Sequence, residues 1–463
     1  MSIEPGTPDG QDGKDDRQRP RAEHPAMPEK VPHVTSQLEA EVNLIVEAFA
    51  AEGKGKEVGV AWRIPGVELD FMYQKGVILV RDAYLAQIPD IVGGGSVAAG
   101  LIDGVTLYSL AGAHNLPEAI SALDEIDRQL GVGVANLNYV LWATTIGHVC
   151  PATEPEPVSV GSGPNPGECP GRDGSGVHIH VPDTGLLADG PAHPWLAGVT
   201  GDLDPFFIPA GAAPPIQPYC GHGTFVAGVA RCMAPLSHIT VASLLNLSAA
   251  QLESEIVLHL DQALDQYPDI ISLSAGATTR GNRPPLAFEV LWQRYRHCKG
   301  VLLVAAASNN GDRTPFWPAA FPEVVSVGAL ASNWRSRASF SDYGGWVDVY
   351  APGEDLVNAF ATGSYQYISE QNADGTPIIR QFHGMARWSG TSFSTPLVAG
   401  LIAARMSRTG ENSRQAADAL LARARAQALA GVGPVLYPCD SDDDCHCRAE
   451  ECCEHCQHSG GRR

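Results

Sequence analysis

Between residues 177 and 330 the sequence alternates short apolar, β-branched runs with longer stretches of helical spacing, and this alternation limits the possible folds most strongly. The apolar runs are Val177–Val181, Ile239–Leu245, Ile270–Leu273, Val301–Ala306 and Val324–Leu330. The helix-like stretches are Gly223–Ala234, Leu252–Gln266 and Leu286–Cys298. Apolar strands between amphipathic helices are typical of a parallel sheet with helices on both faces. The sequence therefore predicts an α/β unit whose functional residues lie at the carboxyl ends of the strands.

A smaller α+β domain of the split βαβ type is predicted for residues 39–147. Its strand-like runs are 76–81, 103–110 and 132–142, and its helix-like runs are 82–92 and 116–130. The remaining boundaries follow from composition. Residues 1–38 are expected to be disordered, 148–176 to form a Pro/Gly-rich linker, 177–437 to form the α/β domain, and 438–463 to form an acidic, Cys-rich tail.

Charge and hydropathy exclude several classes of function. The chain has 463 residues and a formal net charge of −21, which disfavours a nucleic-acid partner. Apolar runs fall short of the roughly 18 residues that a membrane span needs, so no membrane partner is expected. The polar first 25 residues lack the apolar core of a secretory signal. We therefore expect a cytoplasmic protein, or one exported by a route that the sequence does not reveal.

Three short motifs fall at the predicted strand ends and helix starts. Asp183 follows a strand in Val-Pro-Asp-Thr-Gly, His222 opens a helix in Cys-Gly-His-Gly-Thr, and Ser392 opens one in Trp-Ser-Gly-Thr-Ser-Phe-Ser-Thr-Pro. Taken alone, each is more often a turn, a structural histidine or a helix cap. Together, in the order Asp, His, Ser, they indicate nucleophilic catalysis, because a serine hydroxyl needs a neighbouring imidazole to take its proton.

With these motifs, residues 176–408 resemble the subtilisin-like serine peptidases, the subtilase family (peptidase S8). The resemblance implies a hydrolase that cuts peptide bonds through an acyl-enzyme. In this role Asp183 orients His222, His222 acts as the general base and then the general acid, and Ser392 is the nucleophile. It also implies a polypeptide substrate and no cofactor for catalysis.

The family resemblance extends to an oxyanion donor and a substrate-binding strand. Asn309, in Ala-Ala-Ala-Ser-Asn-Asn-Gly, matches the oxyanion asparagine, and loss of such a donor typically lowers kcat by about 10²–10³. Ser308 stands where the family usually has Gly. Ser274, Ala275 and Gly276 match the segment that binds an extended substrate through its backbone.

Other departures from the family pattern lie near these motifs. Phe225 stands where many members have His, and Phe393 where Met is common. We expect neither to touch the reacting groups. The stretch Thr362–Arg387 reads as an insertion on the surface, with a role in substrate choice as the alternative.

The domain at 39–147 resembles, in length and position, the propeptide of many subtilases, which inhibits the enzyme until it is cut. We therefore expect a self-processing zymogen whose own N-terminal domain is its inhibitor, cut between Ala143 and Gly176, and working as a monomer. An unrelated accessory domain is the alternative. For the function, a dedicated processing protease for one precursor and a catalytically silent peptide-binding protein remain alternatives.

Metal binding is weakly indicated. Six of the 11 Cys crowd the tail, where Cys-x-Cys and Cys-Cys-x-x-Cys with nearby His suggest zinc, a disulfide knot or an unpaired flexible tail. Structural calcium is implied by the family resemblance alone, and no metal-binding residue is assigned.

Overall fold

A seven-stranded parallel sheet forms the centre of the larger unit. The computed structural model describes residues 32–53, 55–112, 115–143, 152–168, 173–205, 216–298, 300–371 and 376–438. The strand order in this sheet is β14-β13-β12-β11-β7-β9-β8, and each neighbouring pair is parallel. The strands are β7 His178–Asp183, β8 Thr200–Gly201, β9 His238–Ser243, β11 Ile270–Leu273, β12 Leu302–Ala306, β13 Val325–Leu330 and β14 Val349–Pro352. The predicted α/β class is thus confirmed.

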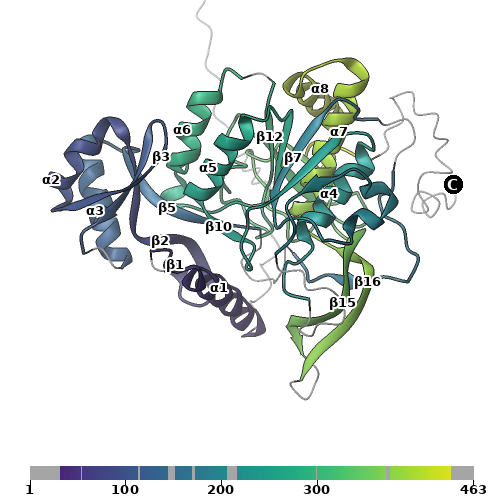
Figure 1. The fold of residues 1–463 in the computed structure, drawn as a ribbon, viewed down its shortest axis with the longest axis horizontal. Helices are drawn as coiled ribbons and strands as arrows, with labels where there is room; N and C mark the ends of the chain where they lie inside the picture. The colour runs from purple at the N-terminus through teal and green to yellow at the C-terminus, as the bar shows by residue number, and fades with distance from the viewer. Residues whose placement is uncertain are drawn as a thin grey trace, which may run out of the picture.

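Helices cover both faces of this sheet. Figure 1 shows α5 and α6 on one side and α4, α7 and α8 on the other. Their bounds are α4 His222–Met233, α5 Glu253–Leu264, α6 Leu286–Tyr295, α7 Thr391–Thr409 and α8 Ser413–Ala426. Helix α7 is buried along most of its length, which explains the apolar run that follows Ser392. Short 3₁₀ turns lie at η2 Gly190–Ala192, η3 Pro194–Leu196 and η4 Arg280–Asn282.

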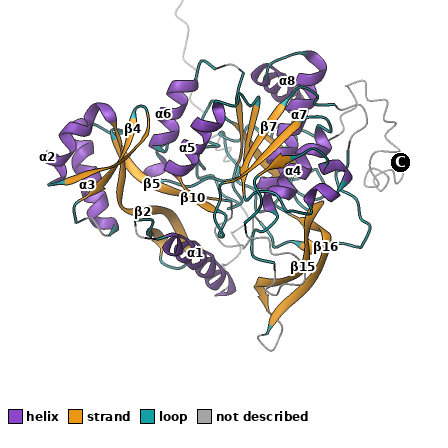
Figure 2. Cartoon of the chain, in the orientation of Figure 1, coloured by secondary structure: helices purple, strands orange, loops and turns teal. Residues whose placement is uncertain are grey.

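The N-terminal unit is an antiparallel sheet flanked by helices (Figure 2). It contains α1 Pro32–Glu52, β1 Val58–Ile64, β2 Glu68–Arg81, η1 Asp82–Gln87, α2 Ile88–Val92, β3 Gly95–Ile102, β4 Val105–Leu110, α3 Leu116–Leu130 and β5 Ala135–Trp142. Helix α3 has the predicted bounds, because Asn115 and Glu118 form a capping box at its start. The sequence analysis missed β1 and β3, whose residues lack a clear alternation of buried and exposed positions.

Helix α1 corrects one predicted boundary. It begins at Pro32, so residues 32–38, which composition predicted to be disordered, are helical. Pro suits the first turn of a helix, where its missing N–H has no partner to lose. Residues 1–31 and the Cys-rich tail from 439 on lie outside the described residues. No helix in the described ranges is long and apolar enough to cross a membrane.

The two units share a sheet. Strand β10, Ala250–Leu252, belongs to the larger unit and pairs antiparallel with β5, so that Leu252 faces Val140 and Ala250 faces Trp142. The sheet of the N-terminal unit therefore continues directly into the larger unit, as Figure 1 shows.

The predicted surface insertion is a long hairpin, and it corrects the predicted linker. Strands β15 Leu356–Gln371 and β16 Pro377–Trp388 pair antiparallel and project from the larger unit (Figure 1). Part of the segment expected to be an unstructured linker adds a third strand, β6 Glu156–Pro157, along β16. Composition favoured a linker because Pro and Gly are poor strand formers, but two residues at a sheet edge suffice for pairing.

Glu154 attaches this segment to the hairpin. Its carboxylate is buried and accepts hydrogen bonds from the Tyr365 hydroxyl at 3.0 Å and from the Ile368 backbone N–H at 2.9 Å. Two residues later, Glu156 is exposed and forms an ion pair with Arg387 at 3.6 Å. Glu156 lies in β6 and Glu154 lies just before it, so the two glutamates differ in burial although they are only two residues apart.

We expect Glu154→Ala to loosen the tip of the hairpin, because it removes the acceptor of two buried hydrogen bonds. The free energy of unfolding should fall by about 1–3 kcal/mol. Backbone hydrogen exchange of residues 365–368 is the measurement, and Glu156→Ala is the matched control, since an exposed ion pair contributes at most about 1 kcal/mol. Equal protection of the hairpin in both variants would contradict the assigned role of Glu154.

Candidate active site

Asp183 ends strand β7, which lies between β9 and β11 in the parallel sheet. Its carboxylate is fully buried, and Oδ1 accepts a hydrogen bond from the Thr184 backbone N–H at 2.7 Å. The turn that follows brings Gly185, at φ +96°, within close approach of the backbone of Leu203 and Asp204. A side chain at that position would collide with this backbone, so the Asp-Thr-Gly sequence is required by packing.

His222 opens helix α4 and faces Asp183. Its Nδ1 lies 2.7 Å from Asp183 Oδ1, and both side chains are fully buried. Its other nitrogen, Nε2, is buried and has no hydrogen-bond partner among the described residues. Nδ1 is therefore held by the carboxylate, while Nε2 remains available as a proton acceptor.

Ser392 lies in the first turn of helix α7, where backbone N–H groups are without helical partners. Ser392 is 1% exposed, and its backbone carbonyl accepts a hydrogen bond from the Ser274 hydroxyl at 3.0 Å. The structure thus brings all three predicted motif residues to one end of the parallel sheet. Ser274 joins them from the strand end of β11.

Asn309 follows β12 and is aimed at the start of α7. Its Oδ1 accepts a hydrogen bond from the Thr391 backbone N–H at 2.7 Å, which fixes the orientation of its amide group beside Ser392. The preceding Ser308, at the position where relatives commonly have Gly, adopts φ +81°. This left-handed conformation is unfavourable for a residue with a Cβ, so the loop holds local strain.

Asp342 binds the backbone of the loop that contains Asn309. The sequence analysis did not identify this residue. Its buried carboxyl group accepts a hydrogen bond from the Asp312 backbone N–H at 3.2 Å and also interacts with the backbone N–H groups of Asn310 and Gly311. Burial, followed by the nearby Asp312, raises its pKa well above the usual value. An acid beside Ser-Phe-Ser carried no signal in the sequence, because its partners are backbone groups.

Two aromatic rings contact His222, which corrects the expectation for Phe393. The imidazole lies 5.4 Å from the ring of Phe393 and 5.5 Å from that of Trp388, measured between centroids. Phe225 packs on both rings, at 4.4 Å from Phe393 and 5.7 Å from Trp388. The expectation that Phe393 stands clear of the reacting groups was wrong, because the start of α7 directs its ring towards the imidazole of His222. These rings enclose the imidazole in an apolar wall.

The segment 274–276, which follows β11, binds the end of the N-terminal unit. Gly276 and Trp142 exchange two backbone hydrogen bonds, at 2.8 and 3.1 Å, and the Ala143 N–H donates to the Ala249 carbonyl at 2.9 Å. Residues 141–143 therefore run between β10 and the strand that includes Ala275. Further along, the Ala152 N–H donates to the Ser389 carbonyl at 3.1 Å. The chain enters and leaves the site close to Ser392.

Metal and thiol chemistry lack support in the described part of the chain. Among the residues described, no group of three or more His, Cys, Asp or Glu is arranged to hold a metal ion. Cys220, two residues before His222, is buried, and burial raises the pKa of its thiol far above the usual value. The predicted zinc ligands of the tail lie outside the described residues.

The chain resembles known proteins in its sequence and in its structure. Residues 174–433 match the subtilase family. The chain is 31% identical over 280 residues to a thermophilic serine proteinase of Bacillus sp. (strain AK1), covering 57% of this chain and 59% of that one. It is 32% identical over 259 residues to thermitase of Thermoactinomyces vulgaris, covering 53% and 81%. A cold-adapted subtilisin-like serine proteinase of known structure aligns with a TM-score of 0.43 and 24% identity, covering 58% and 91%.

We expect Asp342→Asn to change the pH dependence of stability. An acid whose pKa is raised on folding stabilises the folded state fully at low pH, and this contribution is lost as pH rises from about 4 towards the raised pKa. The variant should therefore become more stable relative to the wild type as pH rises, by at most about 1.4 kcal/mol per pH unit. Denaturant unfolding between pH 4 and 8 measures this difference. A constant difference would contradict a protonated Asp342.

Proposed function

The chain belongs to the subtilase family, and from that premise we propose that it is a serine endopeptidase made in a self-inhibited form and activated by cutting itself. The observation that carries the proposal is the arrangement around Ser392. A buried Asp183–His222 pair, a helix start and an oriented amide group converge on this residue, while the chain's own strand fills the adjacent groove.

The proposed mechanism assigns one role to each of these residues. His222 Nε2 accepts the proton of the Ser392 hydroxyl as its oxygen attacks the peptide carbonyl carbon, and later gives that proton to the leaving amine. Asp183, bonded to Nδ1, keeps the imidazole in the required tautomer and stabilises its charged form. The apolar wall of Trp388 and Phe393 excludes water, which strengthens this electrostatic interaction.

Charge on the carbonyl oxygen would be stabilised by two groups of donors. Asn309 Oδ1 is occupied by the Thr391 N–H, so the amide nitrogen on the other side of the group is the donor for the oxyanion. The start of α7 contributes the partial positive charge of a helix N-terminus. Both are held before substrate binds, so little reorganisation accompanies the reaction.

The substrate would bind as an added strand. Ser274, Ala275 and Gly276 form one side of the groove, and β10 forms the other. Backbone pairing on both sides favours any extended polypeptide, whatever its sequence. The pairing of residues 141–143 with both sides supports the N-terminal unit as the inhibitor of its own enzyme, since it occupies the same backbone groups.

Buried contacts hold the N-terminal unit in place. Asn138 is fully buried and accepts a hydrogen bond from the Ser254 N–H at 3.1 Å, which caps helix α5. Glu253, also fully buried, accepts a hydrogen bond from the Ala287 N–H at 2.6 Å and interacts with the backbone of Tyr139. Ion pairs at the rim, including Arg283 with Asp127 at 2.6 Å, add orientation.

We expect the purified wild type to cut itself and Ser392→Ala to remain full length. Trp142 lies opposite Gly276 in an antiparallel register, and in that register a bound peptide has its residue two positions later opposite Ser274, beside Ser392. Counting two residues along the sequence from Trp142, we propose that the cut follows Thr144. Intact mass over time and N-terminal sequencing of the product measure this.

The possible outcomes separate the parts of this proposal. A new N-terminus between residues 144 and 152 in the wild type alone supports both the peptidase and the self-processing. Equal clipping of Ser392→Ala would show that another protease cuts the chain. Uncut wild type whose Ser392 still reacts with a fluorophosphonate would retain the peptidase and reject self-processing.

We expect inhibition by the N-terminal unit to weaken as pH rises. Burial raises the pKa of Glu253 to about 8, so the inhibited form holds a proton that a more exposed carboxyl group would release. That contribution is complete below about pH 4.5 and is lost as pH approaches 8, by at most about tenfold in affinity per pH unit.

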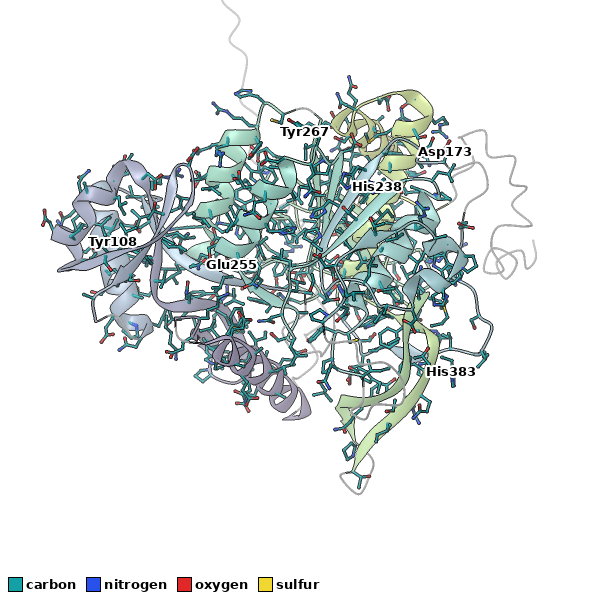
Figure 3. All side chains as sticks on the ribbon, viewed as in Figure 1. Tyr108, Asp173, His238, Glu255, Tyr267 and His383 are labelled. Carbon is teal, nitrogen blue, oxygen red and sulfur yellow. The ribbon has the colours of Figure 1, made fainter. Side chains whose placement is uncertain are left out.

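The inhibition constant of the cleaved N-terminal unit between pH 6 and 8 is the measurement. Glu253→Gln should flatten this dependence. Glu255→Gln is the matched control, since Glu255, labelled in Figure 3, lies in the same helix but is 42% exposed. Its exposed ion pair with Lys56 of the N-terminal unit can change the inhibition constant, so the comparison is of the pH dependence alone. Identical pH profiles for the wild type and Glu253→Gln would reject Glu253 as the titrating group.

A further inference from the structure

Trp142, in the segment that fills the groove, contacts the larger unit through its side chain. Leu141, Trp142 and Ala143 are 0%, 2% and 4% exposed. Successive side chains of a strand point to opposite faces, so Leu141 and Ala143 share one face and Trp142 takes the other. The indole ring of Trp142 packs against Phe316, with centroids 6.3 Å apart and planes at 77°. This edge-to-face arrangement is favourable for an aromatic pair.

Phe316 belongs to the groove and not to the inhibitor. It lies in the loop after β12, and a Cβ added to Gly276 would come within 2.3 Å of its ring. Gly276 is the residue that exchanges both backbone hydrogen bonds with Trp142. The ring thus lies across the glycine that binds the peptide backbone, and only Gly allows this approach.

The position of Phe316 is fixed by its neighbours. Ala277 and Trp317 exchange two backbone hydrogen bonds, at 2.8 and 2.9 Å, which join this loop to the strand at 274–277. Trp317 in turn packs on Phe321, with ring centroids 4.7 Å apart. Phe316 itself is 2% exposed. The surface offered to Trp142 is therefore held by contacts within the larger unit, which favours selectivity.

We propose that the groove selects substrates with an aromatic residue third before the cut, seated against Phe316. This inference rests on the proposed peptidase function and on the proposal that the cut follows Thr144. The preferred substrates are extended, uncharged segments with an aliphatic residue fourth, an aromatic residue third and a small residue second before the cut. Leu141, Trp142 and Ala143 are the chain's own example of this pattern.

The test compares two fluorogenic peptides on the full chain after it has processed itself. The peptides are acetyl-Leu-Trp-Ala-Thr and acetyl-Leu-Ala-Ala-Thr, each joined to aminomethylcoumarin. They differ only in the residue that stands third before the bond to be cut, which is Trp in one and Ala in the other. Active enzyme is counted by labelling Ser392 with a fluorophosphonate. The Trp peptide should have a kcat/KM at least about tenfold higher, since contacts of this size in an apolar pocket discriminate by about 10–200-fold.

Two variants identify Phe316 as the cause. Phe316→Ala should bring the ratio of the two kcat/KM values to within about twofold. Tyr267→Ala is the matched control, because Tyr267 is 84% exposed and lies at the opposite end of α5 from β10, as its label in Figure 3 shows, so the ratio should stay unchanged. Should Phe316→Ala fail to fold, Trp142→Ala tests the same contact, and the affinity of its cleaved N-terminal unit should fall at least about tenfold.

Each outcome bears on the proposal. A ratio near one in the wild type, or a ratio retained in Phe316→Ala, would overturn the aromatic subsite and leave the peptidase intact. Unchanged affinity for the Trp142→Ala unit would overturn it as well. Absence of fluorophosphonate labelling at Ser392 would reject the peptidase itself, and this proposal with it.

Discussion

The parallel sheet determines the hydrogen bond between His222 and Asp183, because it sets the positions of both side chains. Asp183 is a fully buried carboxylate, and such a group is costly unless hydrogen bonds satisfy it. Two donors reach Oδ1, from Thr184 and His222. They can do so because β7 ends in the middle of the sheet, where the next turn and the start of α4 meet. The same sheet end receives Asn309 from β12 and Ser274 from β11, so one packing arrangement positions every proposed catalytic group.

Local signals in the sequence predicted what depends on neighbouring residues. Strands β7, β9, β11, β12 and β13 follow from apolar runs and helix α3 from its helical spacing, whereas β8 and β14 were not predicted. The three motif residues follow from turn and helix-start chemistry. What the sequence could not predict depends on residues far apart. Asp342 acts through backbone groups 30 residues away, and Trp388 reaches His222 only because β16 ends beside α4. Glu156 and Pro157 gave no strand signal, since they pair with Arg387 and Ala386, 231 and 229 residues later.

Three buried carboxyl groups perform three different tasks, which burial alone does not distinguish. Glu154 fixes a segment to the hairpin, Asp342 supports the loop of Asn309, and Glu253 joins the two units. Each accepts at least one backbone N–H, which offsets part of the cost of leaving water. Burial raises the pKa of Asp342 and of Glu253, so the stabilising contribution of each weakens as pH rises. Their protonation therefore couples the loop and the interface to pH.

Residues 141–143 and the groove are matched at the level of the backbone, which would explain how the proposed inhibitor can bind in the same way as a good substrate. Strand pairing on both sides supplies affinity before and after a cut, because the residues on the acyl side keep the same hydrogen bonds. The buried contacts of Asn138 and Glu253 add binding energy far from the cut. A short peptide has only the groove contacts and so dissociates faster. In the proposed self-inhibited form, release of the N-terminal unit, rather than the cut itself, would therefore set when the enzyme becomes active.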